Sequence, residues 1–484
     1  MKRFLTLAAL ILASSMAPAA DLLAVYQRAL QNDPQLREAE ATRLAALEAK
    51  PQALSALLPQ LSASGTVSRE KDTGATNTTE PVSTGPSPTS PTVLESFPFA
   101  GRVDTTTHRY GLDLKQNIFR WENWVALKTA DSQVAQAEAD YQAAQQDLME
   151  RVAQRYFDVL AAQDDLEAQQ VALLSIQRQL DQAESRFQIG LIAVTDVEEA
   201  RAAHDSGAAA VIAAKRTLAS NQELLREITG DGFDFLARPI EPFELTNPDP
   251  VSEDRWVDMA LQQNLSLVSS RLAADIAREN VSSARGGHFP TLDLVGGDYK
   301  ATSNGTDTFN DGTPAGGTTL NQTQRTIGLQ LTFPIYSGGL VSSQVRQAVY
   351  QHRAAKERVE RVARQTEHDA RDSYLGVLSE ISRVKALRRA VQSNAISLRA
   401  TESGYEAGTR TAVDVLQSRQ LWVQATTDYS RSRYDYMLNV IKLQQAAGTL
   451  SQQSLEKINS LLKDSPPPPP ASASEMPDPA ATVR

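Results

Sequence analysis

The chain of 484 residues contains one sequence pattern twice. Phe187-Gln188-Ile189-Gly190, followed by Asp196, recurs as Tyr405-Glu406-Ala407-Gly408, followed by Asp414, 218 positions later. A second match, between segments 110–114 and 327–331, has nearly the same separation. Two matches at nearly the same separation indicate that the chain consists of two duplicated units.

The two ends of the chain differ from the duplicated units. Met1-Lys2-Arg3 is followed by an apolar run that ends in small residues, as in a secretory signal. The run is shorter than the ~20 apolar residues of a membrane-spanning helix, so we predict cleavage of residues 1–19 and export into the cell envelope. Residues 465–484 are rich in proline and predict a disordered tail.

Composition and motifs argue against several functions. A net charge of −10 without a dense basic block argues against nucleic-acid binding, and the absence of cysteine excludes disulfides and thiolate metal sites. The five histidines have no metal-ligand spacing, and we expect the acidic pair Asp164-Asp165 to be solvated. We therefore predict neither an enzyme nor a cofactor or metal, and, without a nucleotide-binding loop, only passive transport.

Two long intervals without proline predict long helices. They lie between Pro98 and Pro239 and between Pro334 and Pro466, and both are rich in good helix formers. In the first interval, apolar residues alternate spacings of three and four, as along a coiled-coil seam, and most positions 218 residues later are also apolar. A helix over residues 121–186 would be ~100 Å long.

Four other segments alternate apolar and polar residues and predict β-strands of about ten residues. They lie near residues 61–67, 110–115, 292–296 and 327–333. The segments that join the strands in pairs, 69–104 and 300–323, are polar and are predicted to be exposed loops. Since membrane barrels need about eight strands, four strands per chain would require several chains to share one barrel.

The fold class is therefore mixed α and β, with long helices and four strands built from two repeats. The predicted divisions are a first repeat at 20–230, an inter-repeat segment at 231–258, a second repeat at 259–448 and a C-terminal segment at 449–464. Each repeat is expected to run helix, strand, loop, strand, long helix, short turn and helix.

Motifs in both repeats resemble those of the TolC-type outer membrane factors. The resemblance covers nearly the whole chain after residue 19, except the strand-joining segments and the tail. It is carried by Asn32-Asp33-Pro34, Leu58-Pro59-Gln60-Leu61, Gly190 to Val197, Gly287 to Leu294, Pro334 to Gly339 and Gly404 to Leu416.

The resemblance implies a homotrimer in the outer membrane of a Gram-negative bacterium. Its twelve strands would form one barrel in contact with outer-membrane lipid, continued by an α-helical barrel in the periplasm with a belt from the segments after residues 230 and 448. The function implied is a passive exit duct for drug efflux or type I protein secretion. The implied partners are a periplasmic adaptor and an inner-membrane transporter of the RND, ABC or MFS type.

The resemblance also implies a gate at the periplasmic helix turns. A clasp would join Gln179, Thr195 and Asp196 of the first half to Glu402, Tyr405 and Arg410 of the second. Asp414 would form a cation-selective ring, weakened because Gln417 stands where a second acid is expected, and Phe187, Gly190 and Gly408 would contribute to adaptor docking.

Two simpler interpretations accompany this assignment. Thr195 with Glu198 fits a capping box, and Asp414 with Gln417 could cap the equivalent helix. Gly190 and Gly408 would permit a positive φ at helix ends. As an alternative function, a periplasmic adaptor would also have long helical hairpins, but with a single hairpin flanked by compact β domains.

Overall fold

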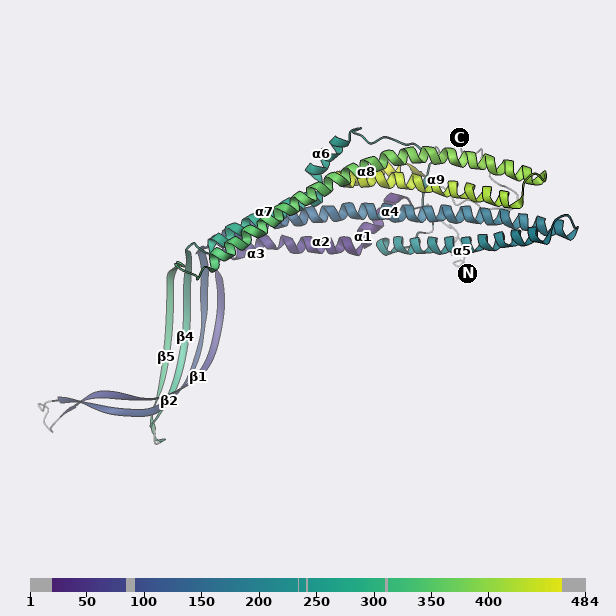
Figure 1. Cartoon of the computed structure of the whole chain (residues 1–484). Coiled ribbons are helices and arrows are strands. Elements are labelled where there is room, and N and C mark those ends of the chain that lie inside the picture. The colour runs from purple at the N-terminus through teal and green to yellow at the C-terminus, as the bar shows by residue number, and fades with distance from the viewer. Residues whose placement is uncertain (1–19, 84–91, 234, 241–242, 310–311, 464–484) are drawn as a thin grey trace, which may run out of the picture. The chain divides into compact units, whose positions relative to one another are not determined.

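The computed structural model describes residues 20–83, 92–233, 235–240, 243–309 and 312–463 (Figure 1). The predicted signal peptide and the whole of the predicted tail lie outside these residues. The chain divides into two compact units, which contain residues 47–134 with 275–354, and residues 1–46 with 135–274 and 355–484. Both units draw on both sequence repeats, because each repeat contributes strands to one unit and helical segments to both.

The two repeats have the same order of long elements. The first repeat contains α1 (Leu22–Asn32), α2 (Pro34–Leu47), α3 (Ala49–Ser55), β1 (Gln60–Ser83), β2 (Thr92–Phe119), α4 (Trp121–Gln188) and α5 (Val194–Thr229). The second contains α6 (Glu253–Gln263), α7 (Leu265–Gly286), β4 (Thr291–Phe309), β5 (Pro314–Thr332), α8 (Leu340–Glu406) and α9 (Ala412–Ala446). The predicted long helices are confirmed, since α4 has 68 residues and α8 has 67.

The strands form one antiparallel sheet in the order β1-β2-β4-β5. Within the described residues, β1 pairs with β2, β2 with β4, and β4 with β5. The predicted strand pairs are confirmed, but the predicted length of ten residues is wrong, because the strands have 24, 28, 19 and 19 residues.

The strand extensions correct the expectation of long exposed loops at 69–104 and 300–323. Strand β1 continues to Ser83 and β2 begins at Thr92, while β4 continues to Phe309 and β5 begins at Pro314. These segments are polar but rich in threonine, which favours extended backbone. Antiparallel pairing, rather than solvent, satisfies the backbone groups of these segments.

The helical unit has its core where α1, α4, α5, α8, α9 and α10 (Gln452–Asn459) meet. Tyr156 and Tyr434 are among its largest fully buried side chains, and Phe157 stacks on Tyr434 with 5.8 Å between the ring centroids. The Tyr156 hydroxyl donates to the Ala237 carbonyl at 2.7 Å. This bond attaches the inter-repeat segment to the long helix α4.

The segments that follow each repeat pair with one another. Strand β3 (Arg238–Pro239) after the first repeat pairs with β6 (Leu462–Lys463) after the second. Sequence alternation did not predict these strands, because a two-residue strand has no detectable period. Their pairing holds the ends of the two repeats together beside the buried core.

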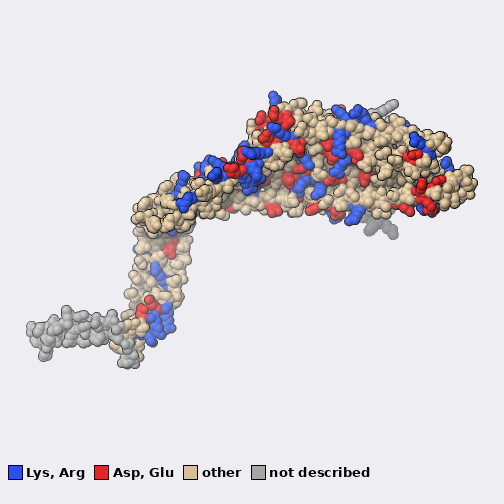
Figure 2. Space-filling model, in the orientation of Figure 1, with Lys and Arg blue, Asp and Glu red and all other residues tan. Residues whose placement is uncertain are grey.

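No helix among the described residues is long and apolar enough to cross a lipid bilayer. Figure 2 shows acidic and basic side chains intermixed over the visible face of the helices, whereas the described strands carry fewer charges.

Candidate functional site

The candidate site is the pair of turns at the ends of the α4–α5 and α8–α9 hairpins. Gly190 has a φ of 78° and Gly408 a φ of 75°, and at neither glycine would an added Cβ meet an atom of the described residues within 4 Å. The predicted positive φ is confirmed at both turns. Backbone conformation rather than crowding therefore requires glycine here, because other residues rarely adopt this left-handed region.

The second turn has a complete capping box. Thr411 is the N-cap of α9, and its hydroxyl accepts from the Asp414 backbone N–H at 3.2 Å. In return, the Thr411 backbone N–H donates to the Asp414 carboxylate at 2.9 Å. Two hydrogen bonds hold the pKa of Asp414 below its ordinary value, one from the backbone N–H and one from the hydroxyl of Thr411. The nearby Arg410 charge also lowers this pKa.

The first turn is capped differently from our prediction. Helix α5 begins at Val194 with Ala193 as its N-cap, and no side chain in the described part of the chain makes a capping bond there. The Thr195–Glu198 capping box is therefore wrong, since Thr195 already lies inside the helix and Glu198 pairs with Arg201 at 2.7 Å. Asp196 lies in the first turn, where the predicted interaction with the helix dipole is favourable.

In the second hairpin, the predicted cap lies three residues too far along the chain. Asp414 caps with Thr411 and not with Gln417. Ala193 and Thr411 occupy equivalent positions in the two repeats, 218 residues apart. A single substitution therefore explains why only one of the two hairpins has the reciprocal cap.

A matching ion pair crosses each hairpin close to its turn. In the first hairpin, Arg201 lies 3.1 Å from Glu184, and in the second, Arg419 lies 2.6 Å from Glu402. Both residues of the second pair follow those of the first by 218 positions. We did not predict these pairs, although comparison of charged positions at the duplication separation would have found them.

Solvent exposure separates the two ion pairs. The Arg201 side chain is 49% exposed, whereas that of Arg419 is 9% exposed. Beside the buried pair, the Ser418 hydroxyl donates to the Thr401 hydroxyl at 3.2 Å. The equivalent residues in the first hairpin, Ala183 and Ala200, belong to a small apolar cluster.

Within one chain, the structure links the two hairpins at one predicted clasp residue, Tyr405, through a partner that the clasp did not include. The Arg186 guanidinium of the first hairpin lies 5.6 Å from the ring centroid of Tyr405 in the second. Among the described residues, neither Thr195 nor Asp196 forms a hydrogen bond or ion pair with Arg410, and all three are exposed.

Gln179 has an unusual environment among the predicted clasp residues. Its side-chain amide nitrogen and oxygen are both shielded from solvent, and neither has a hydrogen-bond partner in the described part of the chain. Glu402, in contrast, already binds Arg419 in its own hairpin. Phe187 is 43% exposed at the first turn.

A polar cluster farther from the turns was missed in the sequence. The Tyr434 hydroxyl donates to Asp164 at 2.7 Å, and Arg238 lies 3.6 Å from Asp164 and 3.0 Å from Glu167. Our expectation that Asp164 is solvated is wrong, because its side chain is only 13% exposed.

Burial determines the electrostatics of this cluster. It raises the pKa of Asp164, although the Arg238 charge and the Tyr434 hydrogen bond counteract that effect. Burial also raises the pKa of Tyr434 well above its ordinary value. The cluster joins α4, α9 and the inter-repeat strand β3, so it connects elements of both repeats.

The described residues contain no group of three or more histidine, aspartate or glutamate side chains placed to hold a metal ion. What the two turns offer chemically is a set of polar contacts between helices. Hydrogen bonds and ion pairs of this kind can be broken and formed again at modest cost.

Known proteins of similar sequence and fold give this geometry a context. The outer membrane efflux protein family matches residues 25–231 and 256–449. The outer membrane protein TolC of Vibrio cholerae is 35% identical over 466 residues, which cover 96% of this chain and 99% of that protein. The proteases secretion protein PrtF of Dickeya chrysanthemi is 26% identical, with 96% of each chain covered.

A solved structure has the same fold. The CmeC outer membrane channel of Campylobacter jejuni superposes with a TM-score of 0.70 at 20% identity, covering 92% of this chain and 89% of that one. These relatives are channel and secretion proteins rather than enzymes, and the adaptor alternative is not favoured. The chain belongs to the outer membrane efflux protein family.

Proposed function

We propose that three copies of this chain form a passive exit duct in the outer membrane, gated at the helix turns, for drug efflux and type I secretion. The relatives named for outer-membrane localisation and for protease secretion support this function. The observation that carries the proposal is a four-stranded sheet whose two outer edges are unpaired within the described residues, in the same chain as two long helical hairpins.

The sheet edges support sharing between copies. Among the described residues, β1 pairs only along its β2 side and β5 only along its β4 side. Long unpaired edges expose backbone donors and acceptors that another strand can satisfy. Pairing β5 of one copy with β1 of the next would remove every edge when the ring closes, and three copies would give the twelve strands proposed for one barrel.

The outer strands also carry an apolar face suited to lipid. Large apolar side chains at alternate positions are exposed in the single chain: Leu61 and Val67 on β1, and Ile327, Leu329 and Leu331 on β5. Ile327 is 80% exposed. An apolar band on one face of tilted strands is the arrangement that outer-membrane barrels present to hydrocarbon.

The helical hairpins would carry the duct into the periplasm. A helix of 68 residues spans about 100 Å at 1.5 Å per residue. We propose that the turns meet a periplasmic adaptor near Phe187, Gly190 and Gly408. The adaptor would connect the duct to an inner-membrane transporter of the RND, ABC or MFS type.

We place the gate at the same turns. Gln179, Thr195 and Asp196 would be linked to Glu402, Tyr405 and Arg410, within one chain or between neighbouring copies. Support comes from the Arg186–Tyr405 contact, which joins the two hairpins next to their turns. Three Asp414 carboxylates would form the cation-selective ring, and the Thr411 hydrogen bonds, which lower the pKa of this carboxyl, favour its charged form.

Planar-bilayer recording of the purified protein tests this function. We expect small, cation-selective conductance steps from the wild-type protein and larger steps from Asp196→Ala and Arg410→Ala variants. Asp414→Asn should reduce cation preference without opening the gate. Protein that inserts into bilayers but gives no conductance with any variant would contradict the duct, whereas wild-type conductance in the Asp196 and Arg410 variants would contradict only the gate.

A further inference from the structure

Arg419 is a buried cation whose hydrogen-bonding capacity is only partly used. Its side chain is 9% exposed, and Nη2 donates to Oε1 of Glu402 at 2.6 Å. The other terminal nitrogen, Nη1, is shielded from solvent and has no hydrogen-bond partner among the described residues. A buried donor without an acceptor is costly, so such an atom calls for an explanation.

The first hairpin shows how the equivalent arginine avoids this cost. Arg201 binds Glu184 through Nη2 and Glu198 through Nη1, so both terminal nitrogens have acceptors. The residue equivalent to Glu198, 218 positions later, is Leu416. Arg419 has therefore lost its second acceptor within its own hairpin and has also lost access to water.

Counting residues from a hydrogen bond between α9 and α4 matches Arg419 with an acceptor on the first hairpin. The Tyr434–Asp164 hydrogen bond fixes one pair of positions on the antiparallel helices α9 and α4. Fifteen residues from this pair toward the turns, α9 reaches Arg419 and α4 reaches Gln179. The Gln179 amide oxygen and nitrogen are likewise shielded and without hydrogen-bond partners.

We propose that Arg419 is a positioning residue of the gate. Its Nη2 holds Glu402 against α9, and its Nη1 binds the amide oxygen of Gln179 when the gate is closed, so that one buried guanidinium ties the two hairpins together. This inference rests on the gating function proposed above and adds to it a residue outside the clasp. The planar guanidinium suits the role because it can serve two acceptors in fixed directions.

Matched arginine variants test the inference in planar bilayers. Arg419→Gln removes the buried link, and Arg201→Gln removes the equivalent exposed pair. A charged hydrogen bond is worth enough to change an equilibrium constant about tenfold. We therefore expect Arg419→Gln to raise the ratio of time spent open to time spent closed about tenfold. Arg201→Gln should leave that ratio unchanged. Arg419→Lys, which keeps the charge but not the fork, should give an intermediate ratio.

Cross-linking supplies a readout that does not depend on the stability of the Arg419→Gln variant. The natural chain has no cysteine, so a Gln179→Cys/Arg419→Cys variant has one defined thiol pair. A short thiol-specific cross-linker should join the two residues and hold the conductance low. The control pair is Gln179→Cys/Gln417→Cys, because Gln417 is exposed on the same helix and should cross-link poorly.

The outcomes separate this inference from the gate itself. If Asp196→Ala and Arg410→Ala raise the conductance but Arg419→Gln does not, the gate stands and the role of Arg419 is overturned. Equal cross-linking of the test and control pairs would also overturn it. If none of the three single variants changes the conductance, the gate proposal fails together with this inference.

Discussion

The two helical hairpins share one backbone plan but differ in how charge is placed between their helices. Both turn at a glycine with positive φ, both have an aspartate in the first turn of the second helix, and both have a Glu–Arg pair across the hairpin. The pair is open to solvent in the first hairpin and buried in the second. After the duplication, the geometry of the turns has stayed the same in the two hairpins, whereas the solvent exposure of the equivalent Glu–Arg pairs has come to differ.

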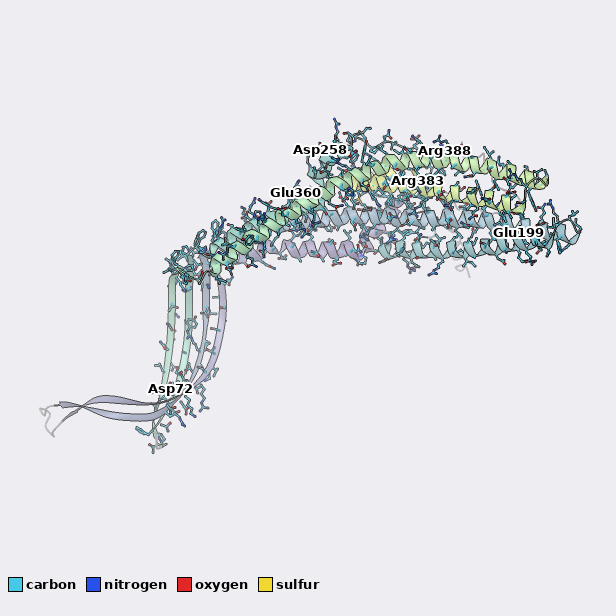
Figure 3. All side chains as sticks on the ribbon, in the orientation of Figure 1. Asp72, Glu199, Asp258, Glu360, Arg383 and Arg388 are labelled. Atoms are coloured by element: carbon cyan, nitrogen blue, oxygen red, sulfur yellow. The ribbon has the colours of Figure 1, made fainter. Side chains whose placement is uncertain are left out.

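Net charge diverges in the same way. Helices α4 and α5 together contain 18 acidic and 9 basic residues, whereas α8 and α9 contain 11 acidic and 16 basic residues. The first hairpin is therefore acidic, at −9, and the second is basic, at +5. Figure 3 marks members of both sets, with Glu199 near the first turn and Arg383 and Arg388 along α8. Opposite charge favours contact between unlike hairpins.

The largest expected effect comes from breaking the link between the repeats at Asp164. Asp164→Ala leaves Tyr434 without its hydrogen-bond acceptor and Arg238 with one carboxylate fewer inside the core. Removal of one partner from a buried charged cluster costs about 3–5 kcal/mol. Thermal unfolding in detergent, followed by circular dichroism, should show a large fall in the melting temperature.

The control for Asp164 is its equivalent in the second repeat, Ser382. This exposed serine binds the carbonyl of Leu378 in its own helix. Ser382→Ala should change the melting temperature little, because exposed substitutions usually alter stability by less than about 0.5 kcal/mol. Equal destabilisation by the two substitutions would show that Asp164 has no special role.

A smaller difference is expected between the two interhelical arginines. Arg419→Ala should lower the free energy of unfolding by about 1.5–3 kcal/mol, because it removes a buried, charged hydrogen bond. Arg201→Ala should lower the free energy of unfolding less than Arg419→Ala does, since the Arg201 pairs are exposed and screened by solvent. Urea titration of both variants checks the order, and a larger loss for Arg201→Ala would reverse the comparison.

Either single substitution of an N-cap residue should make the two turns more alike. Thr411→Ala should lower the free energy of unfolding by about 1 kcal/mol. The substitution removes the hydroxyl that accepts from a helix N–H and also removes one hydrogen-bond donor to the Asp414 carboxylate. Ala193→Thr should stabilise the first hairpin by up to a similar amount. Hydrogen exchange at the first turns of α5 and α9 measures both changes, and faster exchange at α5 after Ala193→Thr would contradict this account.

The smallest expected effect is the change in stability at low pH. Because the pKa of Asp414 is lower in the folded chain than its ordinary 3.8, the cap stabilises fully above pH 3.8 and loses this contribution as the pH falls through the folded-state pKa. Carboxyl NMR titration should place the Asp414 midpoint below 3.8. Thr411→Ala should move the Asp414 midpoint toward 3.8. A midpoint above 3.8 in the wild-type chain would show that the cap does not lower the pKa of Asp414.

Local patterns predicted the framework of the fold. Proline-free intervals located α4 and α8, alternation located four paired strands, and repeated glycines located the turns. Strand length was underestimated because polar threonine-rich segments were assigned to loops, although pairing satisfies their backbone groups.

The candidate site was less predictable than the fold. Whether Asp164 is buried depends on residues from α9 and β3, far away in the sequence, so no local pattern could reveal it. The Thr195–Glu198 box had the right residue types, but the helix starts two residues too early for Thr195 to be its N-cap. The Glu402–Arg419 pair could have been inferred, because its two positions repeat Glu184 and Arg201.

The central claim is that several copies of this chain enclose one lumen. Single-particle electron microscopy of the full chain purified in detergent tests it most directly. The account predicts a threefold particle with a continuous hollow axis, in which an acidic hairpin of one copy lies beside a basic hairpin of the next. A solitary chain, or a threefold particle with no axial channel, would contradict the account.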